Sequence, residues 1–318
     1  MVVQAEQLVV RFRRGWRRTP FKALDGLDLE VREGDFFGLL GQNGAGKSTA
    51  LNCLLGLLRP DAGRVRVLGQ VPEAGGALFR DIGYLPEEPH YHAYLTVEEA
   101  TIYYASLSGV DSPRVRAREM LDRLGLAEHL DRPIGRCSKG MRQKVGIAQC
   151  LLHRPRLLLL DEPMRGLDPM TVHLFRTMLV ELQRAGSTIV MSSHLLSEVQ
   201  QVATRVAIVD RGRLIVQEEL AKLVTTNASA YEIELDDTSD VPPQLQEVTR
   251  PAPGTLRGTL PAEQFYELME LARVRNLRVV RCALKQTTLE ESFLAILAAE
   301  KPTAASGAVM QGTEAPHA

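Results

Sequence analysis

The stretch FFGLLGQNGAGKST, residues 36–49, is the strongest indication of the fold of this chain. It begins with a short apolar run typical of a buried strand and ends where KSTALNCLLGLL takes up helical spacing. Residues 41–49, the phosphate loop, fit GxxxxGK(S/T), whose glycines let successive backbone N–H groups turn toward phosphate oxygens. The residues expected to contact the nucleotide are Gly41, Asn43, Gly44, Ala45, Gly46, Lys47, Ser48 and Thr49. The stretch predicts a site for a nucleoside triphosphate, with Lys47 on the terminal phosphates and the Ser48 hydroxyl on Mg²⁺.

The pattern around this stretch predicts an α/β architecture with a smaller second domain. Short apolar strands alternate with helical segments over residues 1–222, as in an α/β sheet. A mostly helical subdomain is expected at about residues 86–154, opened by a capping box at residues 96–99. Residues 223–299 predict a small α+β domain, and residues 300–318 have too little apolar content to fold, which predicts a disordered tail.

Composition argues against a general affinity for nucleic acid and against a membrane-spanning chain. The formal net charge is −1, and no apolar run approaches the roughly 18 to 20 residues that cross a bilayer. The four cysteines lack paired spacing and no signal-peptide pattern is present, so we expect a reduced, cytosolic protein whose membrane role depends on a partner. The basic segment RFRRGWRR, residues 11–18, fits contact with acidic headgroups or a partner, and equally a solvated loop.

Two further apolar strands end in polar side chains. LLLLDEP places Asp161 and Glu162 at the carboxyl end of one strand, and STIVMSS places His194 at the end of another. Ligands bind at this edge of open α/β sheets, so the three side chains are expected to converge. There Asp161 can hold Mg²⁺, Glu162 can orient or deprotonate a water, and His194 can donate to the γ-phosphate. An ordinary loop histidine is the alternative for His194, whereas the Asp-Glu pair combined with the phosphate loop predicts a hydrolytic site.

The segment CSKGMRQK, residues 137–144, predicts the start of a helix capped by Ser138. Unpaired N–H groups and positive charge at such a helix end suit an anion. No strand leads into the helix, and the simpler alternative is an ordinary Ser-capped helix.

The order of these segments resembles the ATP-binding cassette (ABC) ATPases. Six segments occur in the order found in that family, over roughly residues 3–220: GQNGAGKST, YLPEEP, CSKGMRQK, LLLLDEP, RGLDP and SSH. Residues 228–299, which close on TLEESFLAIL, look like the C-terminal extension of ATPase subunits of bacterial ABC exporters. The resemblance implies a P-loop NTPase core with a mixed sheet and an ATPase that uses ATP and Mg²⁺. It also implies transport, more specifically export, through a separate membrane-spanning partner.

The resemblance implies shared nucleotide sites as well. In this family the signature segment of one subunit closes over the ATP held by another, so Ser138 and Gly140 would face a partner's nucleotide. Asp168, in the loop between subunits, is also expected to contact nucleotide. We expect a homodimer or heterodimer of ATPase subunits on transmembrane permease subunits, at the cytoplasmic face of the membrane. A soluble ABC ATPase that remodels ribosomes or DNA is the alternative. Such proteins usually carry two cassettes in one chain or a long coiled-coil insert, and the sequence predicts neither. No nucleic-acid partner is expected, and the retained catalytic side chains argue against a regulatory module that binds ATP without hydrolysing it.

Several positions depart from the family pattern. Lys139 replaces a glycine, Met141 cannot complete a capping box, and Met164 and Arg165 stand where small polar residues are usual. Glu87 replaces a glutamine in the loop that joins the sheet to the helical insert. As a carboxylate it favours Mg²⁺ or a basic group of the membrane partner, and a solvated loop residue is the alternative.

An aromatic platform for adenine is expected before the strand LDGLDLEV. Phe12 is the predicted residue, with Trp16 and Phe21 as alternatives because the segment RRGWRRTPF blurs the alignment. Stacking at this position would accept other purines as well.

Overall fold

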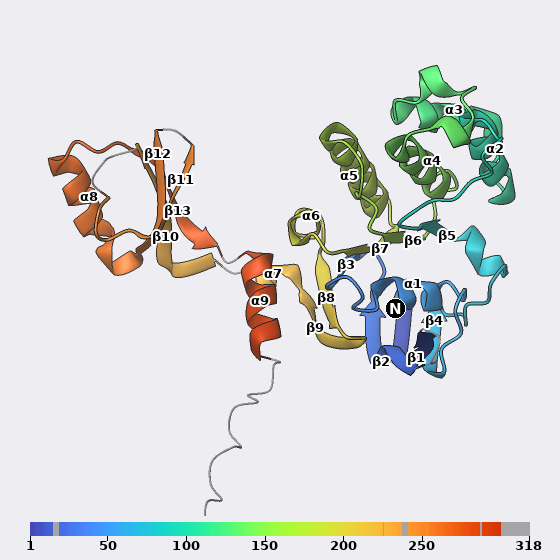
Figure 1. The fold of residues 1–318 in the computed structure, drawn as a ribbon, viewed down its shortest axis with the longest axis horizontal. Helices are drawn as coiled ribbons and strands as arrows, with labels where there is room; N and C mark the ends of the chain where they lie inside the picture. The colour runs from blue at the N-terminus through green and yellow to red at the C-terminus, as the bar shows by residue number, and fades with distance from the viewer. Residues whose placement is uncertain (15–18, 225, 237–240, 253, 287, 300–318) are drawn as a thin grey trace, which may run out of the picture. The chain divides into compact units, whose positions relative to one another are not determined.

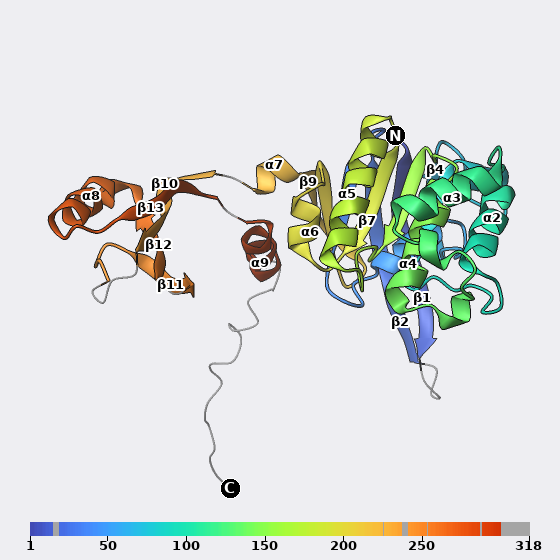
Figure 2. The ribbon, with the colours of Figure 1, turned by 90° about the horizontal axis from the view of Figure 1, so that it is seen from above.

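The chain forms two compact units in a computed structural model, Met1–Leu223 and Val224–Ala318. The structure describes residues 1–14, 19–224, 226–236, 241–252, 254–286 and 288–299. Trp16 and the predicted tail at residues 300–318 lie outside the described residues. Figures 1 and 2 show the elements of both units from two directions.

The first unit contains a six-stranded sheet with strand order β5-β6-β7-β3-β8-β9. Its strands are β3 (Phe36–Leu40), β5 (Ile82–Leu85), β6 (Leu157–Asp161), β7 (Thr188–Ser193), β8 (Arg205–Asp210) and β9 (Arg213–Glu219). Neighbouring strands are parallel except β8 and β9, which are antiparallel. β3 and β6 are buried along their whole lengths, which is why their sequences are apolar almost throughout rather than alternating. The strand that leads into the phosphate loop therefore lies inside the sheet.

A second, antiparallel sheet has the order β2-β1-β4. It consists of β1 (Val3–Arg14), β2 (Thr19–Val31) and β4 (Ala62–Val67). Helix α1 (Lys47–Leu54) contacts both sheets, and apolar side chains such as Leu27, Leu51 and Val190 fill the core between them. Residues 11–14 belong to β1 and pair with β2, so the interpretation of this part of the basic segment as a loop is wrong.

Further helices cover the other face of the six-stranded sheet. α5 (Pro169–Arg184) and α6 (Leu196–Gln200) contact β7, and the short α7 (Leu220–Leu223) contacts β9. Figure 1 shows α1 and α5 on opposite sides of this sheet. A mixed sheet with helices on both faces confirms the predicted α/β class.

The segment between β5 and β6 is largely helical. It contains α2 (Val97–Leu107), α3 (Pro113–Arg123) and α4 (Lys139–Leu151), with 3₁₀ turns at Ala127–His129 and Ile134–Arg136; another turn, Ala77–Arg80, precedes β5. The predicted capping box opens α2, where the Glu99 N–H donates to Thr96 Oγ1 at 3.2 Å and the Thr96 N–H to Glu99 Oε2 at 2.9 Å. α2, α3 and α4 contact one another and form a compact group (Figure 1).

The second unit has its own sheet and core. The antiparallel strands β10 (Thr226–Asp236), β11 (Gln246–Ala252), β12 (Thr255–Pro261) and β13 (Val279–Gln286) are ordered β11-β12-β10-β13. A 3₁₀ turn (Ala262–Gln264) leads into α8 (Phe265–Val274), whose Leu268 packs with Ile233 and Leu256 in the core. Thr288 caps α9 (Leu289–Ala299), because the Glu291 N–H donates to Thr288 Oγ1 at 3.1 Å. None of the described helices is long and apolar enough to cross a membrane.

Candidate active site

The phosphate loop joins β3 to α1, and its path depends on glycines. Gly46 has φ 108°, and a Cβ there would lie 2.6 Å from the Ala23 carbonyl oxygen. A Cβ on Gly41 would lie 2.4 Å from the Val209 carbonyl oxygen, so neither position accepts a larger side chain. α1 begins at Lys47 without a side-chain cap, which leaves its first N–H groups for an anion. Within the loop Gly41, Ala45, Gly46 and Lys47 are buried, Asn43, Gly44 and Ser48 are exposed, and Thr49 is half-buried.

The Lys47 ammonium is buried and has several partners within the chain. Its Nζ donates to the carbonyl oxygens of Gly41 at 2.7 Å and Gln42 at 3.3 Å, and lies 3.5 Å from Glu162 Oε1. The side chains of Lys47 and Glu162 are only 6% and 9% exposed. Phosphate oxygens would replace neutral carbonyl acceptors with anionic ones, which bind an ammonium more strongly.

β6 and β7 bring two acidic side chains to one edge of the sheet. Asp161 is in register with Ser192, whose hydroxyl donates to Asp161 Oδ1 at 2.5 Å and accepts the Glu162 N–H at 3.1 Å. Glu162 has φ 46°, a left-handed conformation that costs energy in a residue other than glycine. Ser192 therefore holds both acidic residues in place. Ser192 is not among the predicted site residues, although its position at the end of a buried strand could have indicated a role.

His194 follows β7 and contacts Glu162. Its Nδ1 lies 2.7 Å from Glu162 Oε2, and its backbone N–H lies 3.4 Å from the same oxygen. The His194 side chain is 36% exposed, so one side of the imidazole faces solvent. The structure thus brings Lys47, Glu162 and His194 together. One oxygen of the Glu162 carboxylate, Oε1, faces the Lys47 ammonium, and the other, Oε2, faces the imidazole of His194.

Asp161, the carboxylate predicted to hold Mg²⁺, is buried, and its charge acts on a neighbouring tyrosine. Burial, together with the charge of Asp161, raises the pKa of Tyr84 to about 12, and burial together with the charge of Glu162 raises the pKa of Glu198. The Ser48 hydroxyl is exposed in the first turn of α1 and offers another oxygen. Among the described residues no group of three or more His, Cys, Asp or Glu side chains is arranged to hold a metal. Mg²⁺ would therefore take its remaining ligands from phosphate and water, as it commonly does.

Three further residues predicted to contact nucleotide, Ser138, Gly140 and Asp168, lie at helix starts. Ser138 caps α4, where its Oγ accepts the Met141 N–H at 3.2 Å. Asp168 caps α5 by accepting the Thr171 N–H at 2.9 Å and the Thr171 hydroxyl at 2.7 Å, and these hydrogen bonds lower the pKa of Asp168. A Cβ on Gly140 would lie 3.3 Å from the Gly166 carbonyl oxygen, so the start of α4 packs closely on the loop before α5.

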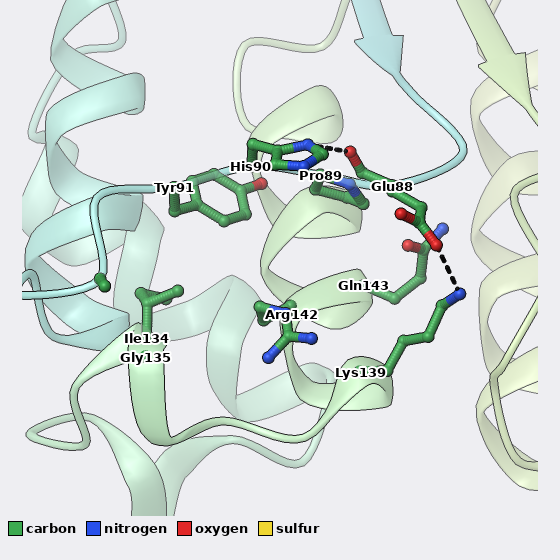
Figure 3. A pocket seen from close by; sticks show the side chains of 10 residues that line it. Glu88, Pro89, His90, Tyr91, Ile134, Gly135, Lys139, Arg142 and Gln143 are labelled. Atoms are coloured by element: carbon green, nitrogen blue, oxygen red, sulfur yellow. Dashed lines mark hydrogen bonds and ion pairs between the residues drawn. The ribbon is translucent and has the colours of Figure 1, made fainter.

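Two side chains that depart from the family pattern, Glu87 and Arg165, pair with each other, and a third, Lys139, pairs with Glu88. The Arg165 guanidinium donates to the Glu87 carboxylate, and Lys139 Nζ donates to Glu88 Oε1 at 2.9 Å. Figure 3 shows the second pair at the rim of a pocket of about 310 Å³ between the loop after β5 and the start of α4. The Lys139 ammonium lowers the pKa of Glu88. Neither pair was predicted, since nothing in the sequence links residues that are 78 and 51 positions apart.

The two described candidates for the adenine platform lie side by side. Phe12 of β1 is directly opposite Phe21 of β2, and their ring centroids are 5.9 Å apart. The residues are 38% and 45% exposed, so both rings offer surface for stacking. Trp16, the third candidate, lies outside the described residues.

Comparison with known proteins identifies the family. The ABC transporter family model matches residues 24–165. An uncharacterised ABC transporter ATP-binding protein of Nostoc sp. is 36% identical over 92% of this chain and 89% of its own length. The chain belongs to the ABC transporter family. This ABC protein is also 31% identical to the Nod factor export ATP-binding protein I of Burkholderia thailandensis, over 87% of this chain and 92% of the relative.

A solved structure supports the same assignment. The dimeric structure of an ATP-binding cassette in a post-hydrolysis state, bound to ADP and Pi, is 25% identical to this ABC protein with a TM-score of 0.63. The match covers 69% of this chain and 99% of the solved chain. The predicted family is therefore confirmed, and the protein is an ABC-type ATPase, the ATP-binding subunit of a transporter.

Proposed function

We propose that this ABC ATPase binds ATP with Mg²⁺, hydrolyses it with Glu162 as the general base, and powers export through a separate membrane-spanning partner. The observation that carries the proposal is the Glu162 carboxylate, buried and placed between Lys47 and His194 at the end of β6. A carboxylate so held beside Lys47 would lie close to the terminal phosphate of a nucleotide in the phosphate loop and could accept a proton from an attacking water.

The roles of the side chains follow from their contacts. Lys47 exchanges the carbonyl oxygens of its own loop for phosphate oxygens, and Glu162 accepts the proton of the attacking water. His194 keeps the Glu162 carboxylate in position through Nδ1 and can donate to the γ-phosphate. Asp161 and Ser48 would hold Mg²⁺, with Glu87 nearby, and bound Mg²⁺ would neutralise charge on the transferring phosphoryl group.

The dimer is the second part of the proposal. Ser138 and Gly140 lie at the start of α4, where N–H groups of the first turn would bind a second subunit's nucleotide, and Asp168 lies at the start of α5. The dimeric arrangement of the solved cassette supports two shared sites, formed by two copies of this chain or by this chain and a related one. Phe12 is the proposed adenine platform.

A groove in the first unit suits the membrane partner. It has a volume of about 810 Å³, and its apolar lining includes Leu57, Phe79, Tyr91, Tyr104 and Leu107. Leu57 and Leu107 are 54% and 63% exposed. Apolar side chains gathered around such a hollow are typical of protein interaction sites. We assign the groove to a cytoplasmic segment of the permease, which places the subunit peripherally on the cytoplasmic face of the membrane; the name of the Burkholderia relative supports export.

The test is purification of the tagged chain from detergent-solubilised membranes of its own host. A partner with several predicted transmembrane segments should co-purify, and Leu107→Glu should abolish this while retaining ATP binding. Val115→Glu is the matched control, because Val115 is 56% exposed on α3 but does not line the groove. Recovery of a ribosomal or DNA complex instead would overturn the proposal. ATP-driven substrate movement into inverted vesicles would support export, and movement out of them would oppose it.

A further inference from the structure

The ion pair between Glu87 and Arg165 lies beside the strand end that carries Asp161. β5 and β6 are parallel neighbours, with Leu85 opposite Leu160. Glu87 follows Leu85 by two residues and Asp161 follows Leu160 by one residue, so both lie just beyond the same end of two adjacent strands. Adjacent strands are about 4.8 Å apart, so the loop that carries Glu87 starts next to the proposed metal ligand. Arg165 comes from the loop that follows Asp161, and its guanidinium donates to the Glu87 carboxylate.

This ion pair is exposed enough to exchange partners. The side chain of Arg165 is 53% exposed and that of Glu87 is 37% exposed, in contrast to the buried pair of Lys47 and Glu162. Water and salt weaken such pairs, and a compact divalent cation attracts a carboxylate more strongly than a hydrated guanidinium does. The Glu87 carboxylate is therefore held, but it can be released.

Other contacts already fix the same loops. The buried Gln143 side chain donates from Nε2 to the Pro163 carbonyl oxygen at 3.1 Å, which ties α4 to the loop after β6. Lys139 separately holds Glu88 (Figure 3). These contacts do not involve the Arg165 side chain, whose ion pair among the described residues is the one with the Glu87 carboxylate.

We propose that Arg165 is a positioning residue that competes with Mg²⁺ for the Glu87 carboxylate. The guanidinium balances the negative charge that Glu87 adds beside Asp161, and it yields the carboxylate when Mg²⁺ enters with the nucleotide. The proposal rests on the proposed function, because it requires Mg²⁺ at Asp161. If the proposal is correct, Arg165 reduces the increase in nucleotide affinity that Mg²⁺ gives. This effect of Arg165 requires the Glu87 carboxylate.

The measured quantity is the gain in affinity that Mg²⁺ gives to a fluorescent, non-hydrolysable ATP analogue, mant-AMP-PNP. It is the ratio of dissociation constants without and with Mg²⁺, determined on the full chain at concentrations that keep it monomeric. Arg165→Met should raise this ratio about two- to fivefold, the range expected for losing an exposed ion pair. Arg165→Lys should leave it near the parental value, because the charge remains.

Replacing both Arg165 and Glu87 tests whether Arg165 acts through the Glu87 carboxylate. With Glu87→Gln present, Arg165→Met should no longer change the ratio. Lys139→Met is the matched control, since it removes the neighbouring ion pair of the same loop and leaves Glu87 paired; it should not raise the ratio. The inference is overturned if Arg165→Met has no effect, if its effect persists with Glu87→Gln, or if Lys139→Met has the same effect. A parental chain that binds the analogue with no gain from Mg²⁺ would instead overturn the proposed function.

Discussion

Replacing Glu162 by glutamine isolates its chemical role with little change in shape. Glutamine matches the carboxylate in size and can still hydrogen bond to His194, whose Nδ1 lies 2.7 Å from Glu162 Oε2. Ser192 holds the backbone of residue 162 through its hydroxyl and carbonyl oxygen, and this support does not depend on the side chain. The substitution therefore removes the negative charge and the capacity to accept a proton, and leaves the site assembled.

The expected loss is confined to turnover. A positioned general base contributes about a hundredfold to ten-thousandfold to rate, which corresponds to about 2.7 to 5.4 kcal/mol of barrier. ATP affinity should stay the same or rise. The reason is that Lys47, now 3.5 Å from Glu162 Oε1, loses an anionic competitor of the phosphate but keeps its bonds to Gly41 and Gln42.

The assay combines single-turnover hydrolysis with equilibrium binding of ATP. Glu162→Gln should bind ATP at least as tightly as the parental chain, hydrolyse it at least about a hundredfold more slowly, and accumulate as an ATP-bound dimer. Lys47→Ala is the control, because it should lose affinity itself. Near-normal hydrolysis by Glu162→Gln would falsify the assignment of Glu162 as the base, and lost ATP binding would show that its charge serves the fold of the site.

Three further predictions concern the rest of the site. Mixing a Ser138→Arg chain with a Lys47→Ala chain should restore one intact site per heterodimer and give activity clearly above either variant alone; confirmed heterodimers without recovery would mean that each chain uses its own α4. Gly46→Ala should lower the thermal unfolding midpoint and abolish ATP binding, because φ 108° and the 2.6 Å approach to Ala23 both exclude a methyl group; unchanged binding would show that the loop can adopt another path. Asp168→Ala should cost about 1 kcal/mol of unfolding free energy by urea titration, and Asp168→Asn much less, because only alanine removes the cap on the Thr171 N–H. These hydrogen bonds also lower the pKa of Asp168, so the stabilisation that they provide is present above the unfolded carboxyl pKa of about 3.9 and is lost as pH falls through the folded pKa. A difference in unfolding free energy between the parental chain and Asp168→Ala that stays constant at acid pH would contradict this.

Local pattern was sufficient for most of the first unit. The apolar runs of β3, β6 and β7 and the capping box at Thr96 depend on neighbours in sequence, and all of them form as predicted. β11 lies at the edge of its sheet, is largely exposed and contains Pro251, so its sequence shows no alternation that would predict a strand. The loop interpretation of residues 11–14 failed because Phe12 and Phe21 pair across β1 and β2, a contact that a basic segment does not reveal.

Sequence alone was enough to predict the phosphate loop, the candidate roles of Lys47, Glu162 and His194, and the family. Each depends on a residue type at a fixed number of positions from a strand or helix end, and such spacings can be read directly from the sequence. Tertiary structure alone decided that Ser192 holds Asp161 and that Arg165 neutralises Glu87. These side chains are 31 and 78 positions apart, and they meet because parallel strands of the same sheet bring the ends of distant segments together.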